Sequence, residues 1–298
     1  MRGTLRIERA GPLTTIQDCG RHGMLAHGIS ASGPMDIPAF SNAGLLAGGQ
    51  GAGIEITRAG LDFVVTDGQV SAGWSGGAFD VKINGRAAEW PGGAQLTGGD
   101  RVSITPGAAG NYGYVRFGGL LELQPVLGSL STSIRARLGG IAGRVLEVGD
   151  ELVLNGNGAP GRGISQTISH GGPIRFIRGL HWDRFSPNVQ GGFVTAQFRV
   201  SAMMDRMGVR LVDEERVFAG ESILSLVSDP ALPGDIQILG DGTPTVLMRD
   251  HQPTGGYPRI GTIISVDLDR FAQMRPGSVV AFQAVSVEHA HRLLRSGA

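Results

Sequence analysis

One segment near the C-terminal end, DHQPTGGYPRIG (Asp250–Gly261), concentrates side chains that can bind a small molecule. Its paired glycines would let a ligand approach the backbone closely. Its arginine offers a planar fork that suits a carboxylate, and its other polar side chains offer hydrogen bonds. The substrate-binding candidates are Gln252, Thr254, Gly255, Gly256, Tyr257 and Arg259, and Tyr257 is also a catalytic candidate. The segment is predicted to be a binding loop, and the alternative is a β-turn with polar surface groups.

A second polar segment, TTIQDCGRHGMLAHGISASGPMD, covers residues 14–36. It precedes an expected helix, and a helix N-terminus with its free N–H groups can hold an anionic group. The candidates here are Asp18, Arg21 and Asp36 for catalysis, and Gln17, Ser32 and Gly33 for substrate binding. The alternative is a long loop whose polar groups cap one another.

Three further motifs favour structural interpretations. GNGAPG at 156–161 has the spacing of a dinucleotide fingerprint, but no helix pattern follows it, so a linker is predicted. GWSGG at 73–77 fits a nucleophile elbow, but a strand pattern follows it, so a hairpin turn is predicted. His289 and His291 lie two apart on an expected helix and face different sides, so no metal site is predicted.

The chain has a single lysine, Lys82, in the context FDVKING. No stretch matches the phosphate-binding pattern GxxxxGK[ST], and Lys82 has no Met-Lys-Met setting of the kind that is biotinylated. No covalently bound cofactor is therefore expected in this chain. ATP or carboxybiotin, if used, must be supplied through partner subunits.

The composition excludes several classes of partner. The 298 residues carry 26 basic and 26 acidic side chains, and this balance gives no support for a nucleic-acid or membrane-surface partner. A signal peptide and a long apolar span are both absent from the sequence, and Cys19 is the one cysteine. These features predict a cytoplasmic protein in a reducing compartment.

The fold class follows from short alternating strands and abundant glycine. The chain has 50 glycines, which fall mostly between apolar runs such as AFDVKI, RVSITP and ELVLN. Two β-rich halves are predicted, 1–160 and 170–298, joined by a glycine-rich linker at about 155–172. Three short helices are expected: one begins near Ser32 as cap, one begins at Asp267 as cap, and one begins at Ser286 as cap and ends at Gly297.

Four blocks give the sequence a family resemblance. They are GPLTTIQDCGRHG with GISASGPMD, LGSLSTS (Leu127–Ser133), MDRMGVRL (Met204–Leu211), and PGDIQILGDGTP with DHQPTGGYPRIGTIISVDL. Together they resemble allophanate hydrolase subunit 2, also called the biotin-dependent carboxyltransferase-like family or the C component of 5-oxoprolinase. The carboxyltransferase domain of urea carboxylase is similar. Departures are Cys19-Gly20 after the first Asp, Met204 in place of Ser, and Arg259 in place of Lys.

The resemblance implies a cyclophilin-like β-barrel architecture, which agrees with the mainly β reading of the sequence. It also implies a partner, a homologue of allophanate hydrolase subunit 1, which is the B component of 5-oxoprolinase, and possibly a third lactam-utilisation subunit. The chemistry implied is ATP-dependent hydrolysis of 5-oxoproline to glutamate. Such chemistry handles a small amide or ureido group, and oriented N–H donors with an arginine stabilise the developing oxyanion.

Two alternatives remain open at the level of sequence. One is a component of a urea or other biotin-dependent carboxyltransferase. The other is a regulatory binding protein that antagonises a kinase inhibitor. Allophanate hydrolysis by this chain alone is not expected, because the amidase Ser–Ser–Lys set needs a glycine- and serine-rich segment with a lysine that this sequence lacks.

Overall fold

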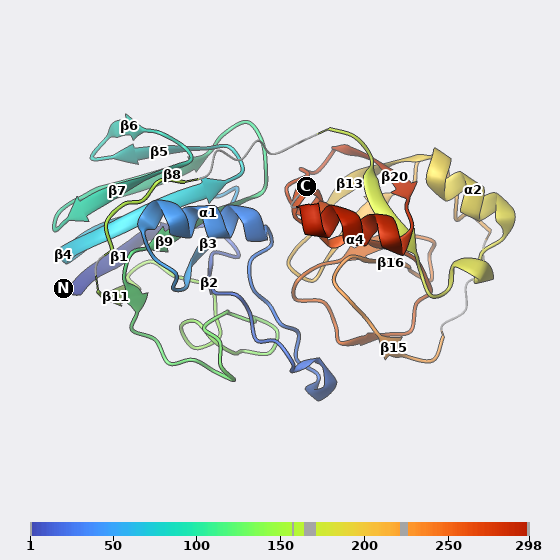
Figure 1. The fold of residues 1–298 in the computed structure, drawn as a ribbon, viewed down its shortest axis with the longest axis horizontal. Coiled ribbons are helices and arrows are strands. Elements are labelled where there is room, and N and C mark those ends of the chain that lie inside the picture. The colour runs from blue at the N-terminus through green and yellow to red at the C-terminus, as the bar shows by residue number, and fades with distance from the viewer. Residues whose placement is uncertain (1, 157, 164–170, 221–225, 297–298) are drawn as a thin grey trace. The chain divides into compact units, whose positions relative to one another are not determined.

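The computed structural model describes residues 2–156, 158–163, 171–220 and 226–296. The chain forms two compact units (Figure 1). The first contains Met1–His22 and Ala31–Thr167, and the second contains Gly23–Ser30 and Ile168–Ala298. The predicted boundary near 155–172 stays a proposal, and residues 157 and 164–170 of that linker lie outside the described residues.

The first unit contains one 11-stranded sheet. Its longest strand, β4, has 16 residues and is shared by two parts of the sheet. Its first residues pair with β1 and β8, and its last residues pair with β7 and β9. In chain order the strands are β1 (Arg2–Ala10), β2 (Thr15–Gln17), β3 (Gly53–Thr57), β4 (Leu61–Gly76), β5 (Phe79–Ile83), β6 (Arg86–Ala88), β7 (Gly92–Thr97), β8 (Arg101–Pro106), β9 (Tyr112–Phe117), β10 (Leu120–Leu121) and β11 (Glu151–Asn155).

Helix α1 (Ile37–Ala47) lies along the face of β4 (Figure 1). The approach is close at Gly73, where a Cβ would lie 2.3 Å from the backbone nitrogen of Ala47. Gly73 of the GWSGG segment thus contacts α1. Residues 73–76 lie in strand β4 and Gly77 follows its end, so the predicted hairpin turn was wrong for the first four residues of the segment. A glycine at position 73 permits the helix to pack directly on the strand backbone.

The second unit is built on a closed seven-stranded barrel in the order β12-β19-β16-β17-β14-β13-β20. The mainly β, barrel-based prediction is confirmed by this sheet. Its strands are β12 (Ile174–Arg178), β13 (Gln197–Met204), β14 (Gly208–Val212), β16 (Asp235–Ile238), β17 (Pro244–Leu247), β19 (Arg259–Ile263) and β20 (Val279–Ala284). A separate two-stranded ladder joins β15 (Asp229–Pro230) to β18 (Thr254–Gly255).

Phenylalanines fill part of the interior of the second unit. Phe193 stacks on Phe282 with ring centroids 4.9 Å apart, and Phe176 meets Phe193 edge to face at 5.2 Å. Phe198 adds a further ring to this cluster, and all four are nearly inaccessible to solvent. Phe176, Phe198 and Phe282 lie at inward positions of strands, where apolar residues alternate with outward polar ones, and Phe193 comes from the helix Pro187–Thr195.

The helices differ from expectation at their starts. Asp36, not Ser32, is the N-cap of α1, and its carboxylate accepts a hydrogen bond from the backbone N–H of Ala39 (3.0 Å). Helix α3 (Ser265–Ala272) has Ile264 at the cap, and Asp267 lies inside its first turn. These two cap predictions were wrong because each helix begins at a different residue from the one that its apolar pattern indicated.

Two more helices complete the second unit. In α4 (Val287–Ser296) the hydroxyl of Ser286 accepts from the N–H of His289 (3.2 Å), as a capping serine does; the predicted end at Gly297 lies outside the described residues. Helix α2 (Pro187–Thr195) is not among the three helices expected from the sequence. Short 3-10 turns are η1 (Leu25–His27) and η2 (Trp182–Arg184). Over the described parts of the chain, no helix is long and apolar enough to cross a bilayer.

Candidate functional site

Asp18 lies in the first unit and is fully engaged by hydrogen bonds. Its carboxylate accepts from the hydroxyls of Ser129 and Ser131 (both 2.6 Å) and from the backbone N–H groups of Leu130 (2.6 Å) and Gly20 (2.9 Å). Burial acts to raise the pKa of Asp18, but these hydrogen bonds outweigh it and hold the pKa below its ordinary value. Asp18 therefore fixes the LGSLSTS segment as a permanently ionised anchor.

Gln17 and Arg21 bind the same segment. The Gln17 amide nitrogen donates to the hydroxyl of Thr15 (2.9 Å) and to the carbonyl of Thr132 (3.2 Å), and its side chain has no exposed surface. Nη2 of Arg21 donates to the carbonyl of Ser131 (2.6 Å). These contacts make both side chains part of the scaffold that joins β2 to residues 127–133.

Ser32 and Gly33 lie next to this scaffold. The N–H of Gly33 donates to Oε1 of Gln17 (3.1 Å), which fixes the turn before α1. Ser32 has a φ of 57°, a left-handed conformation that is uncommon for a residue with a side chain. Its hydroxyl oxygen is buried and has no hydrogen-bond partner among the residues that the structure describes. An unsatisfied buried hydroxyl is costly, so Ser32 is the strongest remaining binding candidate of this unit.

Asp36 belongs to a buried network that sequence reasoning missed. Its backbone N–H donates to the hydroxyl of Tyr114 (2.8 Å), which in turn donates to Glu55 (3.0 Å). Glu55 also accepts from the N–H of Met35 (2.8 Å). Burial, and then the charges of Glu55 and Asp36, raise the pKa of Tyr114 well above its ordinary value, so the phenol stays protonated and can donate.

In the second unit, a buried ion pair holds the start of the DHQPTGGYPRIG segment. Nε and Nη2 of Arg206 contact the two carboxylate oxygens of Asp250 at 2.9 and 3.1 Å. Both residues are nearly inaccessible, at 2% and 7% exposure. The backbone N–H of Asp250 also donates to the carbonyl of Arg206 (2.7 Å). Two blocks that are 44 positions apart in the sequence are thereby joined.

His251 is buried directly after this ion pair. Its Nδ1 lies 2.7 Å from the carbonyl of Gln252, a contact in which the neutral ring donates Nδ1–H. Burial lowers the pKa of His251, and the hydrogen bond to Gln252 and the nearby Asp235 and Asp250 oppose this only in part. The ring is therefore neutral in the folded protein at pH 7.

This histidine gives a pH prediction. A folded-state pKa below the unfolded value of about 6.5 contributes stability above that pH and loses it as the pH falls, because the unfolded chain then binds more protons. We expect the free energy of unfolding, measured by urea denaturation, to fall between about pH 7.5 and 5. The His251→Asn variant should flatten this dependence, and His289→Asn, on the exposed helix α4, should not. Equal slopes in all three proteins would contradict the assignment.

The middle of the segment is held by a pair of amides. Nε2 of Gln252 donates to Oε1 of Gln237 (3.2 Å), and Gln237 is 1% exposed. A Cβ on Gly255 would lie 2.3 Å from Nε2 of Gln237, and one on Gly256 would lie 2.9 Å from the carbonyl oxygen of Leu226. Neither glycine has a positive φ, so close packing, and not backbone conformation, requires them.

Thr254 and Tyr257 are the accessible side chains of the segment. Thr254 is exposed, and Tyr257 is 40% exposed. The ring of Tyr257 lies beside the β16–β17 hairpin, where a Cβ on Gly240 would be 3.9 Å from Cε1 of Tyr257. The backbone around these side chains is held by the pairing of β18 with β15 and by the N–H of Ile238, which donates to the carbonyl of Pro258 (3.0 Å).

The position and contacts of Arg259 differ from those predicted from the sequence. It begins the barrel strand β19 and does not lie at a loop tip. Its Nη1 donates to the carbonyl of Pro230 (2.7 Å) and lies 3.3 Å from Asp235, while Nη2 lies 3.6 Å from Asp229. Since Asp235 is itself only 2% exposed, the guanidinium already has a buried counter-ion. The arginine joins the barrel to the β15–β18 ladder.

Several of these residues had no local signal in the sequence. They are Glu55, Tyr114, Arg206, Asp229, Asp235 and Gln237. Only Arg206, Asp235 and Gln237 lie in blocks that carry the family resemblance. Each of them is a polar residue in or beside a strand. The alternation of apolar and polar residues along a strand does not show which residue such a side chain will pair with.

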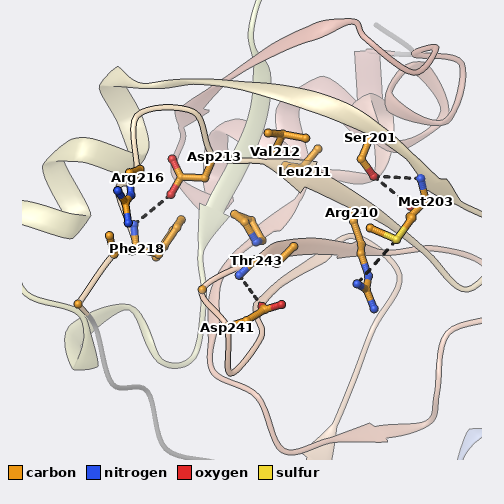
Figure 2. A pocket seen from close by; sticks show the side chains of 14 residues that line it. Ser201, Met203, Arg210, Leu211, Val212, Asp213, Arg216, Phe218, Asp241 and Thr243 are labelled. Atoms are coloured by element: carbon orange, nitrogen blue, oxygen red, sulfur yellow. Dashed lines mark hydrogen bonds between the residues drawn. The ribbon is translucent and has the colours of Figure 1, made fainter.

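A separate pocket of about 460 Å³ lies across β13, β14 and β17 of the second unit (Figure 2). Its polar lining includes Ser201, Arg210, Asp213, Arg216, Asp241 and Thr243. The backbone N–H of Thr243 donates to Asp241 (2.9 Å), and this contact, chiefly, with Arg210 as a smaller contribution, keeps the pKa of Asp241 low. The pocket carries both signs of charge, and none of its residues was selected from the sequence.

Among the described residues, neither the GNGAPG motif nor a cluster of metal ligands provides a cofactor site. Gly156 follows strand β11, but residues 158–163 form neither helix nor strand, so the described part of the GNGAPG motif lacks the helix that a dinucleotide site needs. Within the described ranges, no group of three or more His, Cys, Asp or Glu side chains is arranged to hold a metal ion.

Known proteins are similar to this chain in sequence and in fold. The chain is 34% identical over 293 residues to the C component of 5-oxoprolinase from Escherichia coli, covering 96% of this chain and 93% of that protein. The crystallised protein TTHA0988 superposes with a TM-score of 0.84 at 27% identity, over 94% of this chain and 55% of that one. Urea amidolyase of Kluyveromyces lactis gives a TM-score of 0.88 at 25% identity, over 98% of this chain and 19% of that one.

This chain thus spans about half of TTHA0988 and about a fifth of the urea amidolyase. A family model described as "Carboxyltransferase domain, subdomain A and B" matches residues 27–284, most of the chain and parts of both compact units. The match and the near full-length similarity to the 5-oxoprolinase C component agree with the resemblance in the four sequence blocks. The chain belongs to the carboxyltransferase domain, subdomain A and B, family.

Proposed function

We propose that this chain is the C component of a heteromeric, ATP-dependent 5-oxoprolinase, which hydrolyses 5-oxoproline to glutamate. The observation that carries the proposal is the similarity to the Escherichia coli 5-oxoprolinase C component over nearly the full length of both chains. That relative is named as one subunit of its enzyme, which supports an assembly with other chains. The partner proposed is a homologue of the 5-oxoprolinase B component, with a third lactam-utilisation subunit and with ATP supplied through the complex.

Within this function, the accessible polar groups of the second unit are proposed to contact the substrate. Tyr257 and Thr254 present hydroxyls, and Gly255 and Gly256, which lie between them, are packed against Gln237 and the carbonyl of Leu226. Ser32 is proposed as a binding position of the first unit taken by itself, since its hydroxyl is buried without a partner among the described residues. The other candidates are proposed to have a structural role, because each is held by hydrogen bonds within the protein. They are Asp18, Arg21, Asp36, Gln17 and Arg259.

A carboxyltransferase component that acts on urea is the second candidate. The match to the urea amidolyase structure over 98% of this chain favours it. Both substrates present a planar group with N–H and C=O side by side, so the same contacts serve either. The regulatory role against a kinase inhibitor stays a prediction from the family resemblance, and no contact described above favours it.

A complementation experiment tests the proposal. An Escherichia coli strain that lacks its own 5-oxoprolinase C component should accumulate 5-oxoproline. Expression of this chain, alone or together with the B-component homologue from its own source, should lower that accumulation. The matched negative control is the Arg206→Met variant, which we expect not to fold stably. Accumulation that is unchanged in both arrangements would argue against a 5-oxoprolinase role.

A further inference from the structure

Asp229 lies across the two-stranded ladder from the glycine pair. β15 pairs antiparallel with β18, and Asp229 is directly opposite Gly255. Directly opposed residues of an antiparallel pair place their side chains on the same face. The side chain of Asp229 therefore lies on the face of the ladder to which a side chain at position 255 would point, and Gly255 has none. Its side chain is 43% exposed, so the carboxylate can be reached beside the proposed substrate-binding residues.

Two basic side chains orient one oxygen of this carboxylate. Oδ2 of Asp229 lies 3.7 Å from Nε2 of His181 and 3.6 Å from Nη2 of Arg259. Nδ1 of His181 accepts a hydrogen bond from the backbone N–H of Arg259 (3.1 Å). A neutral histidine that accepts at Nδ1 carries its proton on Nε2, the nitrogen that faces Asp229. Among the described residues both basic groups contact Oδ2, and Oδ1 can accept a hydrogen bond from a ligand.

The charges of the cluster decide what kind of group it attracts. The positive charge of Arg259 is already matched by Asp235, which is 2% exposed and also accepts from the hydroxyl of Thr262 (2.6 Å). Burial, and then the nearby cations Arg259 and Arg184, lower the pKa of His181, so the histidine adds no charge at pH 7. Arg259, Asp235 and Asp229 together carry a net charge of −1, which the nearby Arg184 offsets. Asp229 is the more exposed of the two carboxylates, so the accessible part of the cluster attracts N–H donors.

We propose that Asp229 accepts the N–H of the substrate amide and is a specificity-determining residue of the site. The ligand class is a planar amide with a free N–H, such as a lactam or a ureido group. The substrate carboxylate of a lactam acid points away from Asp229, and Arg259 is a positioning residue that holds Asp229 instead of binding that carboxylate. The substrate assignment rests on the proposed function, and the N–H selectivity extends it.

The chemistry of an amide explains why this group is needed. The candidates selected in the DHQPTGGYPRIG segment offer hydroxyl, amide and guanidinium donors, which suit the substrate C=O. An amide N–H left without an acceptor in a protein site loses its hydrogen bond to water, and sites that satisfy it discriminate strongly against analogues without it. Asp229 is a partly exposed acceptor on the ladder that carries Thr254 and Gly255.

The test compares ligands with and without the N–H. In the reconstituted complex, kcat/KM is measured for 5-oxoproline and for N-methyl-5-oxoproline with wild type, Asp229→Ala and Asp229→Asn. We expect Asp229→Ala to lower kcat/KM for 5-oxoproline at least tenfold, chiefly through KM, and to bring the preference over the N-methyl compound close to one. Asp229→Asn keeps an acceptor oxygen and should retain part of the preference. Glu288→Ala, on the exposed helix α4, is the control.

A binding measurement separates this inference from the proposed function. The isolated wild-type chain and Asp229→Ala are titrated with 2-pyrrolidone and N-methyl-2-pyrrolidone, followed by protein NMR. A preference for the N–H lactam that Asp229→Ala abolishes supports the inference even if the complex does not turn over 5-oxoproline. An unchanged preference in Asp229→Ala, an equal loss of both substrates, or equal binding of both lactams to wild type would overturn it. Melting curves show that each variant is folded.

Discussion

Replacing Arg206 with methionine is expected to destabilise the second unit by about 3–5 kcal/mol. The reason is the carboxylate of Asp250, which the substitution leaves buried with its paired contacts removed. Breaking one partner of a buried pair costs more than the net worth of the pair, because the remaining charge keeps its desolvation penalty. Urea denaturation of the isolated chain measures the loss.

The double variant Arg206→Met/Asp250→Leu distinguishes this mechanism from a simple packing defect. With both charges gone, the loss should be clearly smaller than the sum of the two single losses. Arg199→Met removes one partner of an exposed pair with Glu214 and should leave the unfolding curve nearly unchanged. Additive losses in the double variant would show that the ion pair is not what holds the DHQPTGGYPRIG segment.

The second large effect is expected at Arg259. The sequence placed this arginine at a loop tip, where its loss would spare folding and remove activity. The structure gives it buried contacts with Asp235 and the carbonyl of Pro230, so Arg259→Ala should destabilise the second unit by about 2–4 kcal/mol. Arg259→Lys keeps the charge beside Asp235 but cannot reproduce the fork, and an intermediate loss is expected.

Melting and activity must be measured together for these variants. If Arg259→Ala unfolds at the wild-type denaturant concentration and loses only activity, the arginine faces the substrate and the sequence-based role stands. If stability and activity fall together and Arg259→Lys recovers part of both, the arginine is a support for Asp229 and Asp235.

Much of the fold could be predicted because strand signals are local. ELVLN alternates apolar and polar residues and forms β11, with Leu152 and Leu154 buried. Helix α2 was missed because Gly191 and Gly192 lower the helix propensity of a stretch that Ser186 and Pro187 nevertheless start by capping. GWSGG was misread because Gly73 is required by the close packing of helix α1, which comes from another part of the chain.

The site was only partly predictable for a related reason. Composition identified the two polar segments, since polar groups among glycines are visible in any window. It could not show which of those groups are already paired. Asp18 is engaged by Ser129 and Ser131, and Asp250 by Arg206, across separations of 111, 113 and 44 positions. Pairing over such distances is set by sheet topology, so a single sequence does not distinguish an anchoring carboxylate from one that meets a substrate.

The measurement that tests the central claim most directly is glutamate formation from 5-oxoproline and ATP by the reconstituted complex, with wild type and with Tyr257→Phe. The substitution removes one partly exposed hydroxyl and leaves the Gln252–Gln237 hydrogen bond that holds the segment in place. We predict turnover that requires this chain, and a kcat/KM lowered about tenfold or more in Tyr257→Phe with an unchanged melting temperature. A wild-type complex that forms no glutamate, or a Tyr257→Phe complex with wild-type kcat/KM, would contradict the account.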